Sequence, residues 1–161
     1  MRYFTIKQNI PLVFENKVNG DKSCDVFYLS GDPEGTKPDF IEEPVMMMAG
    51  YLKKIVDLYQ DGVGFENAVL IHHQRNLQFP YVKINIPSID AISDLTEYYP
   101  NQMFKRLVFS RRKIGDHQFF MVSDRRIKHP IVSLSVAESL LRRKVKGIAF
   151  EEVEVADDEH R

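Results

Sequence analysis

Two segments of the chain repeat one short sequence pattern. "DGVGFENAVL" at residues 61–70 aligns without gaps on "KGIAFEEVEV" at residues 146–155, so that Gly62 matches Gly147. Both segments follow an amphipathic stretch that begins shortly after a proline. A proline before a helix and a glycine after it limit where that helix can lie. The pattern predicts an internal duplication of strand, loop, helix, glycine and strand; the alternative is a chance similarity between periodic elements.

Two amphipathic helices are predicted, over residues 45–60 and 134–145. In each of them the apolar residues recur at helical spacing and share one face. These residues are Met48, Tyr51, Leu52, Ile55 and Tyr59 in the first helix, and Val136, Leu140, Leu141 and Val145 in the second. We expect Ser133 or Ser135 to begin the second helix as its N-cap, and a glycine to end each helix.

Most of the remaining apolar pattern is typical of β-strands. Residues 79–87 alternate between apolar and polar side chains, as a half-buried strand does. In both repeat copies the alternation changes phase, after Glu66 in the first and after Glu151 in the second. A strand of period two changes face only where an extra residue is inserted, so we expect a β-bulge at each position.

These elements predict an α+β fold, with a mainly antiparallel sheet and two principal helices. A chain of 161 residues suits a single domain, which we place at residues 1–155. Its two repeat-like halves are residues 25–70 and 119–155. The last residues, 156–161, are mostly charged and are expected to form a frayed acidic tail.

Charge is distributed unevenly along the chain, although the net charge is only −1. Residues 105–146 carry 12 Lys and Arg against 3 Asp and Glu, whereas the segments before and after them are acidic. One interpretation of this basic block is a nucleic-acid surface. The other, which we favour, is that the block forms ion pairs with the acidic segments.

Several classes of protein are disfavoured by the sequence. No apolar run approaches the length of a membrane span, and the first residues lack the apolar core of a signal peptide. The single cysteine, Cys24, excludes an intrachain disulfide and favours a reducing, cytoplasmic location. "GVGFEN" lacks the spacing of a phosphate-binding loop, and the adjacent residues His72 and His73 would point to opposite faces of a strand. We therefore expect no enzyme activity, no cofactor and no metal.

A series of motifs resembles the bacterial immunity protein family eleven, which occurs in polymorphic toxin systems. The motifs follow one another in the family's order over roughly residues 25–155. They are "KPDFIEEPV", an Asp-containing segment with Asp90 and Asp94, "QFFMV", "IVSL" at 131–134 and "KGIAFEEV". The resemblance implies an α+β domain that binds and neutralises a cognate protein toxin. It implies no catalytic residues.

Three functional hypotheses follow from the sequence. The first is a non-catalytic immunity protein, with a toxin as its partner. The second is a nucleic-acid-associated module that uses the basic block at residues 105–146. The third is either an enzyme with an unrecognised site or a structural interaction domain.

Candidate partner-binding residues lie in two segments where aromatic and acidic side chains adjoin. Aromatic side chains provide large contact areas, and acidic neighbours attract a basic partner. These residues are Asp39, Phe40, Glu42 and Glu43 in the first segment, and Asp94, Glu97, Tyr98 and Tyr99 in the second. The alternative is that these aromatic residues fold inward and cover the edge of the sheet.

Overall fold

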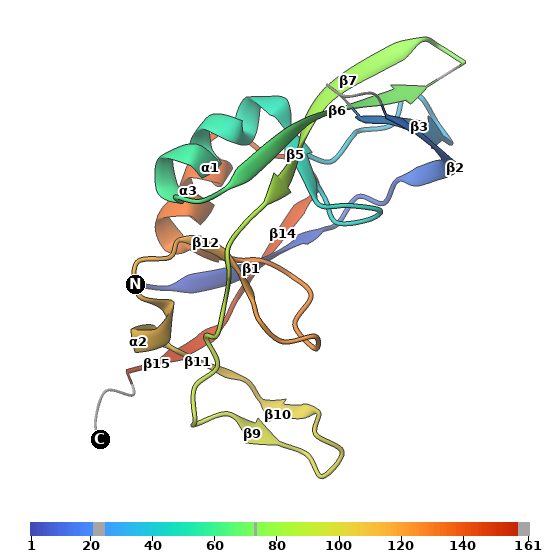
Figure 1. Cartoon of the computed structure of the whole chain (residues 1–161). Helices are drawn as coiled ribbons and strands as arrows, with labels where there is room; N and C mark the ends of the chain where they lie inside the picture. The colour runs from blue at the N-terminus through green and yellow to red at the C-terminus, as the bar shows by residue number, and fades with distance from the viewer. Residues whose placement is uncertain (21–24, 73, 158–161) are drawn as a thin grey trace.

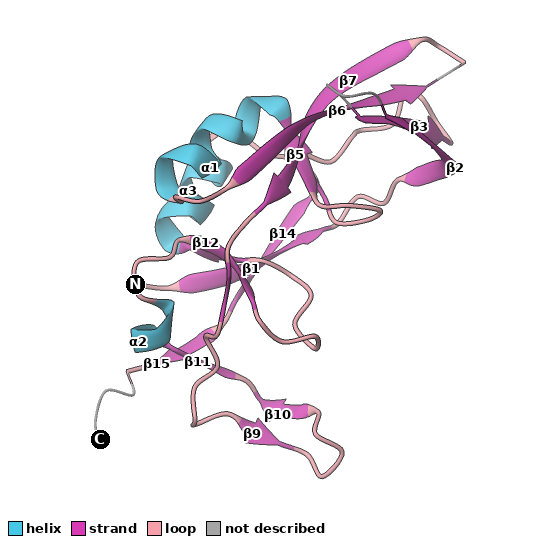
Figure 2. Ribbon diagram, in the orientation of Figure 1, coloured by secondary structure: helices cyan, strands magenta, loops and turns pink. Residues whose placement is uncertain are grey.

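The described residues are built mainly into β-sheet, with three short α-helices at the sides (Figure 1). The structure, a computed structural model, describes residues 1–20, 25–72 and 74–157. The ribbon view shows the predominance of strands and places α1 and α3 next to each other (Figure 2). The prediction of a mixed fold with mainly antiparallel sheet is confirmed.

The first sheet has five strands and contains both the first strand of the chain and one of the last. Its order is β14-β1-β13-β12-β8, and only the β12–β8 pair is parallel. The bounds are β1 Tyr3–Gln8, β8 Ser88–Ile89, β12 Phe119–Val122, β13 Ile131–Ser133 and β14 Ile148–Glu152.

The second sheet has six strands and is drawn from the first half of the chain. Its order is β2-β3-β6-β7-β5-β4, and only the β3–β6 pair is parallel. The bounds are β2 Val13–Gly20, β3 Asp25–Ser30, β4 Phe40–Ile41, β5 Met47–Ala49, β6 Gly64–His72 and β7 Leu77–Asn85.

Two short strand pairs and the helices complete the fold. The antiparallel pair of β9 and β10 projects away from both sheets, and the parallel pair of β11 and β15 lies between it and α2 (Figure 1). The strand bounds are β9 Glu97–Tyr98, β10 Phe104–Arg106, β11 Val108–Ser110 and β15 Glu154–Ala156. The helix bounds are η1 Gly50–Leu52, α1 Lys53–Tyr59, α2 Arg111–Ile114 and α3 Leu134–Arg142.

The first predicted helix is shorter than expected. Residues 47–49 form strand β5 between β7 and β4, and the helical turns begin only at Gly50. Met47 and Met48 are adjacent and both completely buried, which requires apolar surroundings on both faces of a strand. Tyr51, expected on the buried face, is more than half exposed. Pairing with β7 therefore overrides the helical spacing at this position.

The second predicted helix is confirmed as α3; its start agrees with the prediction, and its end lies earlier than predicted. Ser133 is the N-cap, since its hydroxyl accepts a hydrogen bond from Val136 N at 3.2 Å. Leu141, expected on the buried face, is exposed. The helix ends at Arg142, and Lys144 already has a positive φ of 56°, so the chain leaves the helix before Gly147.

The inner parts of the two repeat copies have the same topology. In the first copy β5 leads through α1 to β6, and β7 lies between these two strands. In the second copy β13 leads through α3 to β14, and β1 lies between them. The outer strands differ, because β3 pairs with β6 whereas β12 pairs with β13. A common origin of the two copies stays a prediction.

The predicted β-bulges in the repeat are absent from the strands concerned. The β6–β7 register is regular from Gly64 to His72, and the β14–β1 register is regular from Ile148 to Glu152. In the second copy the phase changes because the chain leaves β1 at Val153 and then pairs with β11 as β15. In the second copy the strand therefore changes face because it changes its partner strand, without the inserted residue that was expected.

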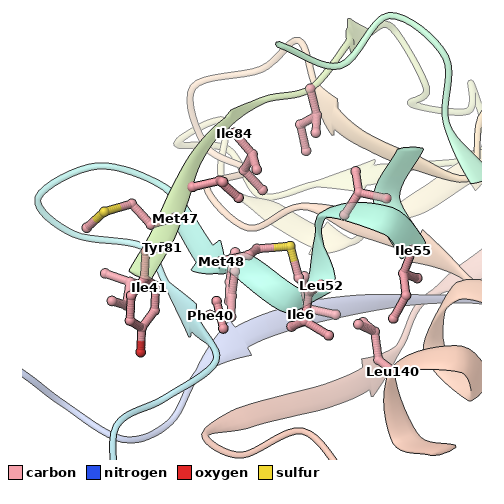
Figure 3. Packing of buried hydrophobic residues seen from close by; sticks show 14 of the residues in the cluster. Ile6, Phe40, Ile41, Met47, Met48, Leu52, Ile55, Tyr81, Ile84 and Leu140 are labelled. Carbon is pink, nitrogen blue, oxygen red and sulfur yellow. The ribbon is translucent and has the colours of Figure 1, made fainter. Parts of the chain in front are cut away.

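The main hydrophobic core lies between the two sheets and the two longer helices. Ile6 of β1, Met48 of β5, Leu52 of η1 and Leu140 of α3 meet there and are fully buried (Figure 3). A second cluster lies on the opposite face of the five-stranded sheet, around Phe109 of β11. Both faces of that sheet are therefore covered, which explains why all three residues of β13 are buried.

Some sequence predictions lie wholly or partly outside the described residues. These are the residue Cys24, the strand face of His73, and residues 158–161 of the predicted tail. The tail was expected to begin at residue 156, which the structure places at the end of β15.

Candidate binding surface

The first predicted binding segment is part of the folded core. Phe40 is completely buried in the main hydrophobic cluster and is not available as an exposed anchor. One oxygen of Asp39 accepts hydrogen bonds from the Tyr51 hydroxyl at 2.9 Å and from Lys146 N at 2.7 Å.

The acidic residues that follow Phe40 have different surroundings. Glu42 contacts Gln8 N at 2.8 Å and His129 Nδ1 at 2.6 Å, so its carboxylate is occupied within the fold. Glu43, in contrast, is exposed. Phe40 is therefore a core residue and not the exposed anchor that was expected, and Asp39 and Glu42 form contacts within the fold; partner binding through Glu43 stays a prediction.

The second predicted segment lies on the surface, in what we call the arm, residues 94–106. The arm consists of β9, β10 and the turn between them, and it projects from the rest of the molecule (Figure 1). Asp94, Glu97, Tyr98 and Tyr99 are all exposed. The structure therefore brings these four residues together and separates them from the first segment.

Large apolar side chains are concentrated on the arm. Eleven large hydrophobic side chains are exposed among the described residues, and four of them lie between positions 95 and 103. They are Leu95 at 53%, Tyr98 at 43%, Tyr99 at 49% and Met103 at 53% exposure. A group of exposed apolar residues rimmed by charges is typical of interaction sites, whereas single exposed apolar residues need no explanation.

Arg126 holds the arm in place from the loop between β12 and β13. Its guanidinium lies over the ring of Phe104, 4.2 Å from the centroid, and 5.2 Å from the centroid of Tyr98. The Tyr98 and Phe104 rings contact each other at 5.5 Å between centroids. Arg126 also donates a hydrogen bond to the backbone oxygen of Gln102 in the arm's turn. These contacts stabilise one position of the arm.

Asp124 fixes Arg126 in turn. Its two carboxylate oxygens accept hydrogen bonds from Arg126 Nε at 2.9 Å and Nη2 at 2.7 Å, a bidentate arrangement. The hydrogen bonds from Arg126 lower the pKa of Asp124 to about 2. The pair therefore stays charged throughout the physiological pH range. The sequence pattern placed Arg126 only within the basic block and did not predict its role at the arm, although the spacing in "SDRR" allows an aspartate to hold an arginine two positions later.

The base of the arm is tied to the body by polar contacts. Thr96 Oγ1 donates to Val108 O at 2.9 Å and accepts from Val108 N at 3.0 Å. Arg106 forms ion pairs with Glu154 of β15 and with Glu97. Between the arm and the five-stranded sheet lies a groove of about 310 Å³, with Phe104 and Arg126 on one wall and Lys7 on the other. Hydrogen bonds and ion pairs at its base thus hold the arm against the rest of the protein.

Five of the twelve basic residues in the block form ion pairs within the described part of the chain. Arg106 and Arg111 pair with Glu154 and Asp157 of the C-terminal acidic segment. Lys113 and Arg126 pair with Asp90 and Asp124. These pairs agree with the ion-pair interpretation of the block and leave a smaller set of cations to contact a nucleic acid. Arg112 and Arg125 of the block, in contrast, have no ion pair within the described part of the chain.

The described residues offer no arrangement of metal ligands. Nowhere in residues 1–20, 25–72 and 74–157 do three His, Cys, Asp or Glu side chains come together in a way that could hold an ion. The pair of His129 and Glu42 lines a surface cavity of about 500 Å³ together with Lys128 and Gln8. A histidine held by a carboxylate resembles part of a general base, but among the residues described around this cavity no serine, threonine or cysteine is present to act as a nucleophile.

Comparison with known proteins adds no relative. No protein-family model matches the chain, and no curated protein matches it. The resemblance to immunity proteins therefore rests on the sequence motifs alone. Within the described residues, none of the helices has the length and apolar character needed to cross a membrane.

Proposed function

We propose that this chain is a non-catalytic, immunity-type protein that uses its arm to bind and neutralise a cognate protein toxin. The observation that carries the proposal is the gathering of Leu95, Tyr98, Tyr99 and Met103 on one projecting hairpin. The sequence resemblance supplies the class of partner.

The arm has the physical properties of a binding surface. Tyrosine and methionine side chains bury a large area on contact, and aromatic residues are enriched among those that dominate binding energy. The contacts of Arg126 with Phe104 and Tyr98 order the arm before it meets a partner. Ordering in advance lowers the entropic cost of association.

Charge contributes less to partner binding than the sequence pattern indicates. Glu97 is paired with Arg106, so its charge is largely compensated within the arm. Asp94 remains an exposed carboxylate at the start of the arm. We therefore attribute affinity mainly to the apolar residues and assign electrostatic steering a minor role.

The test is rescue of bacterial growth when the protein is co-expressed with the toxin encoded beside its gene. Tyr99→Ala combined with Met103→Ala removes two side chains of the arm that are about half exposed, at 49% and 53%. We expect this double variant to lose rescue, since anchor residues contribute at least about 2 kcal/mol each, or roughly 30-fold in affinity. Its melting temperature should stay within about 2 °C of the wild type.

Leu58→Ala is the matched control. Leu58 is 76% exposed on α1, away from the arm, so its removal tests whether any exposed apolar residue matters. We expect full rescue. If Tyr99→Ala with Met103→Ala rescues as well as the wild type does, the arm is not the binding surface.

A further inference from the structure

A cavity that no residue of the arm lines gathers several cations. It measures about 610 Å³ and lies where the loop before β4 meets the chain segment that follows α3. Lys37 comes from the loop, and Arg143, Lys144 and Lys146 come from the segment after the helix. The ring of Tyr51 and that of Phe79 form part of its wall.

The charges at this cavity are poorly compensated. Among the described residues that line it, only Asp39 is acidic, and its Oδ2 atom already accepts hydrogen bonds from Tyr51 Oη and Lys146 N. Within the described residues, none of the four cations has a carboxylate within ion-pair distance. The cavity thus carries a net charge of about +3, whereas Arg106, Arg111 and Lys113 in the same basic block are paired.

The backbone brings these cations together. Lys144 has a φ of 56° and Gly147 a φ of 73°, and these two left-handed residues turn the chain back immediately after α3. Left-handed conformations of residues other than glycine are uncommon and cluster at functional sites. Lys37 is also fixed, because its Nζ donates to Gly35 O at 2.5 Å and lies 5.3 Å from the centroid of Phe79.

We propose that this cavity binds a small ligand that carries two or more phosphate groups. Several converging cations without carboxylate partners match the charge of linked phosphates, and charge-assisted hydrogen bonds to phosphate are strong. The volume lies within the range of small-molecule sites. Tyr51, which is 54% exposed, offers a planar surface beside the cations. The site is separate from the arm and does not depend on toxin binding.

A small ligand fits the distribution of charge better than a nucleic-acid strand does. A nucleic acid presents phosphates along its whole length and needs a corresponding row of cations. Here four cations without a carboxylate partner among the described residues line one cavity, whereas Arg106, Arg111 and Lys113 elsewhere in the basic block are paired.

The experiment is isothermal titration calorimetry of the whole protein at about 0.15 M salt, with pyrophosphate, ATP and adenosine as separate probes. We expect saturable binding of pyrophosphate and ATP and none of adenosine. Lys144→Gln combined with Lys146→Gln should weaken the binding of ATP about 10-fold or more, the equivalent of one lost charge-assisted contact. Arg112→Gln combined with Arg125→Gln removes two exposed cations elsewhere and should change the affinity less than about 2-fold.

The outcomes separate the possible ligands. Tighter binding of ATP than of pyrophosphate identifies a nucleotide, and equal binding identifies an inorganic polyphosphate; both support the proposal. The proposal is overturned if neither probe saturates by about 1 mM, or if the control pair weakens binding as much as the pair at the cavity. It is also overturned if a single-stranded RNA oligonucleotide binds more tightly than ATP and the control pair weakens that binding. Circular dichroism melting of both double variants verifies that they are folded.

Discussion

Gln8 and Glu42 exchange two hydrogen bonds, in which the side-chain oxygen of each accepts the backbone N–H of the other. The bonds measure 2.8 Å to Glu42 Oε1 and 2.9 Å to Gln8 Oε1. Gln8 ends β1 in the five-stranded sheet, and Glu42 follows β4 in the six-stranded sheet. The exchange therefore continues the hydrogen bonding of one sheet into the other, and His129 occupies the second carboxylate oxygen of Glu42.

Removal of this carboxylate should destabilise the junction between the sheets. Glu42→Ala leaves Gln8 N without its acceptor in a partly buried position, which costs about 1–2 kcal/mol of unfolding free energy. Glu43→Ala is the matched control, because Glu43 is exposed and should change the free energy by less than about 0.5 kcal/mol. Urea denaturation measures both. Equal stabilities of the two variants would show that the exchange contributes nothing.

A buried amide at the end of α1 joins that helix to the five-stranded sheet. Gln60 is 8% exposed, and its Oε1 accepts from Gln118 N at 2.8 Å and from Phe119 N at 3.1 Å. Gln60→Met keeps the length of the side chain and removes the acceptor, so two backbone N–H groups lose their partner. We expect a loss of about 1–3 kcal/mol in thermal or urea unfolding. Gln78→Met, at an exposed position of β7, is the control and should leave the unfolding free energy almost unchanged. A loss in Gln78→Met as large as that in Gln60→Met would refute the role assigned to the Gln60 acceptor.

The two matching glycines of the repeat should differ in their tolerance of alanine. Gly62 has a φ of 75°, and the space that a Cβ would occupy there is open, so Gly62→Ala meets backbone strain alone, about 1–2 kcal/mol. At Gly147 the φ is 73°, but a Cβ would lie 2.5 Å from Pro38 Cβ and 2.8 Å from Pro38 Cα. Gly147→Ala should therefore cost roughly 1–3 kcal/mol more. The melting temperatures of the two variants, measured side by side, test this difference. An equal loss of stability in both would contradict the predicted clash at Gly147.

Protonation of His72 should weaken the fold in mild acid. His72 is 4% exposed, and its burial, with a smaller contribution from Lys37, lowers its pKa below the ordinary value of 6.5. The unfolded chain thus binds this proton more readily than the folded chain, so stability is greatest above about pH 6.5 and falls as the pH drops below that value.

The comparison is between wild type and His72→Leu over the range from about pH 7.5 to 5.5. The wild type should lose more unfolding free energy than the variant over this range, because the variant has no imidazole to protonate. Identical pH profiles would mean that His72 is already accessible to protons in the folded state.

Strong local patterns allowed a correct prediction of part of the fold. Residues 79–87 alternate over a full strand length and form most of β7, and Val136 and Leu140 lie on the buried face of α3 as their spacing predicts. In α3 one face is buried and the other is not, and in β7 the expected apolar face is buried although Tyr81 on the other face is buried too, so local spacing records much of the location of the core.

The start of the first helix could not be predicted in this way. Met47 and Met48 lie in a strand buried on both faces, and a short apolar run has the same local appearance in a helix and in such a strand. The strand exists because Met47 pairs with Lys83 and Met48 with Val82, and sequence spacing carries no record of pairing at that distance.

The two candidate binding segments show the same limitation. Phe40 and Tyr98 both adjoin acidic residues, yet Phe40 is buried and Tyr98 is exposed. The acidic neighbours of Phe40 contact residues 34 and 107 positions away, which draws this segment into the core. Tyr98 contacts Phe104 within the same hairpin and stays outside. Long-range partners, which a single sequence does not reveal, decide between the two outcomes.

The position of β1 in the sheet has a consequence for folding during synthesis. Both neighbours of β1, β13 and β14, come from residues 131–152, so more than a hundred residues must be synthesised before this strand can pair. At about 5–20 residues per second on the ribosome, both edges of β1 stay open for on the order of 10 s. Pairing across such a sequence distance also slows folding after release. The nascent chain therefore presents an unpaired strand, with the apolar side chain of Ile6, to chaperones until its last third has been made.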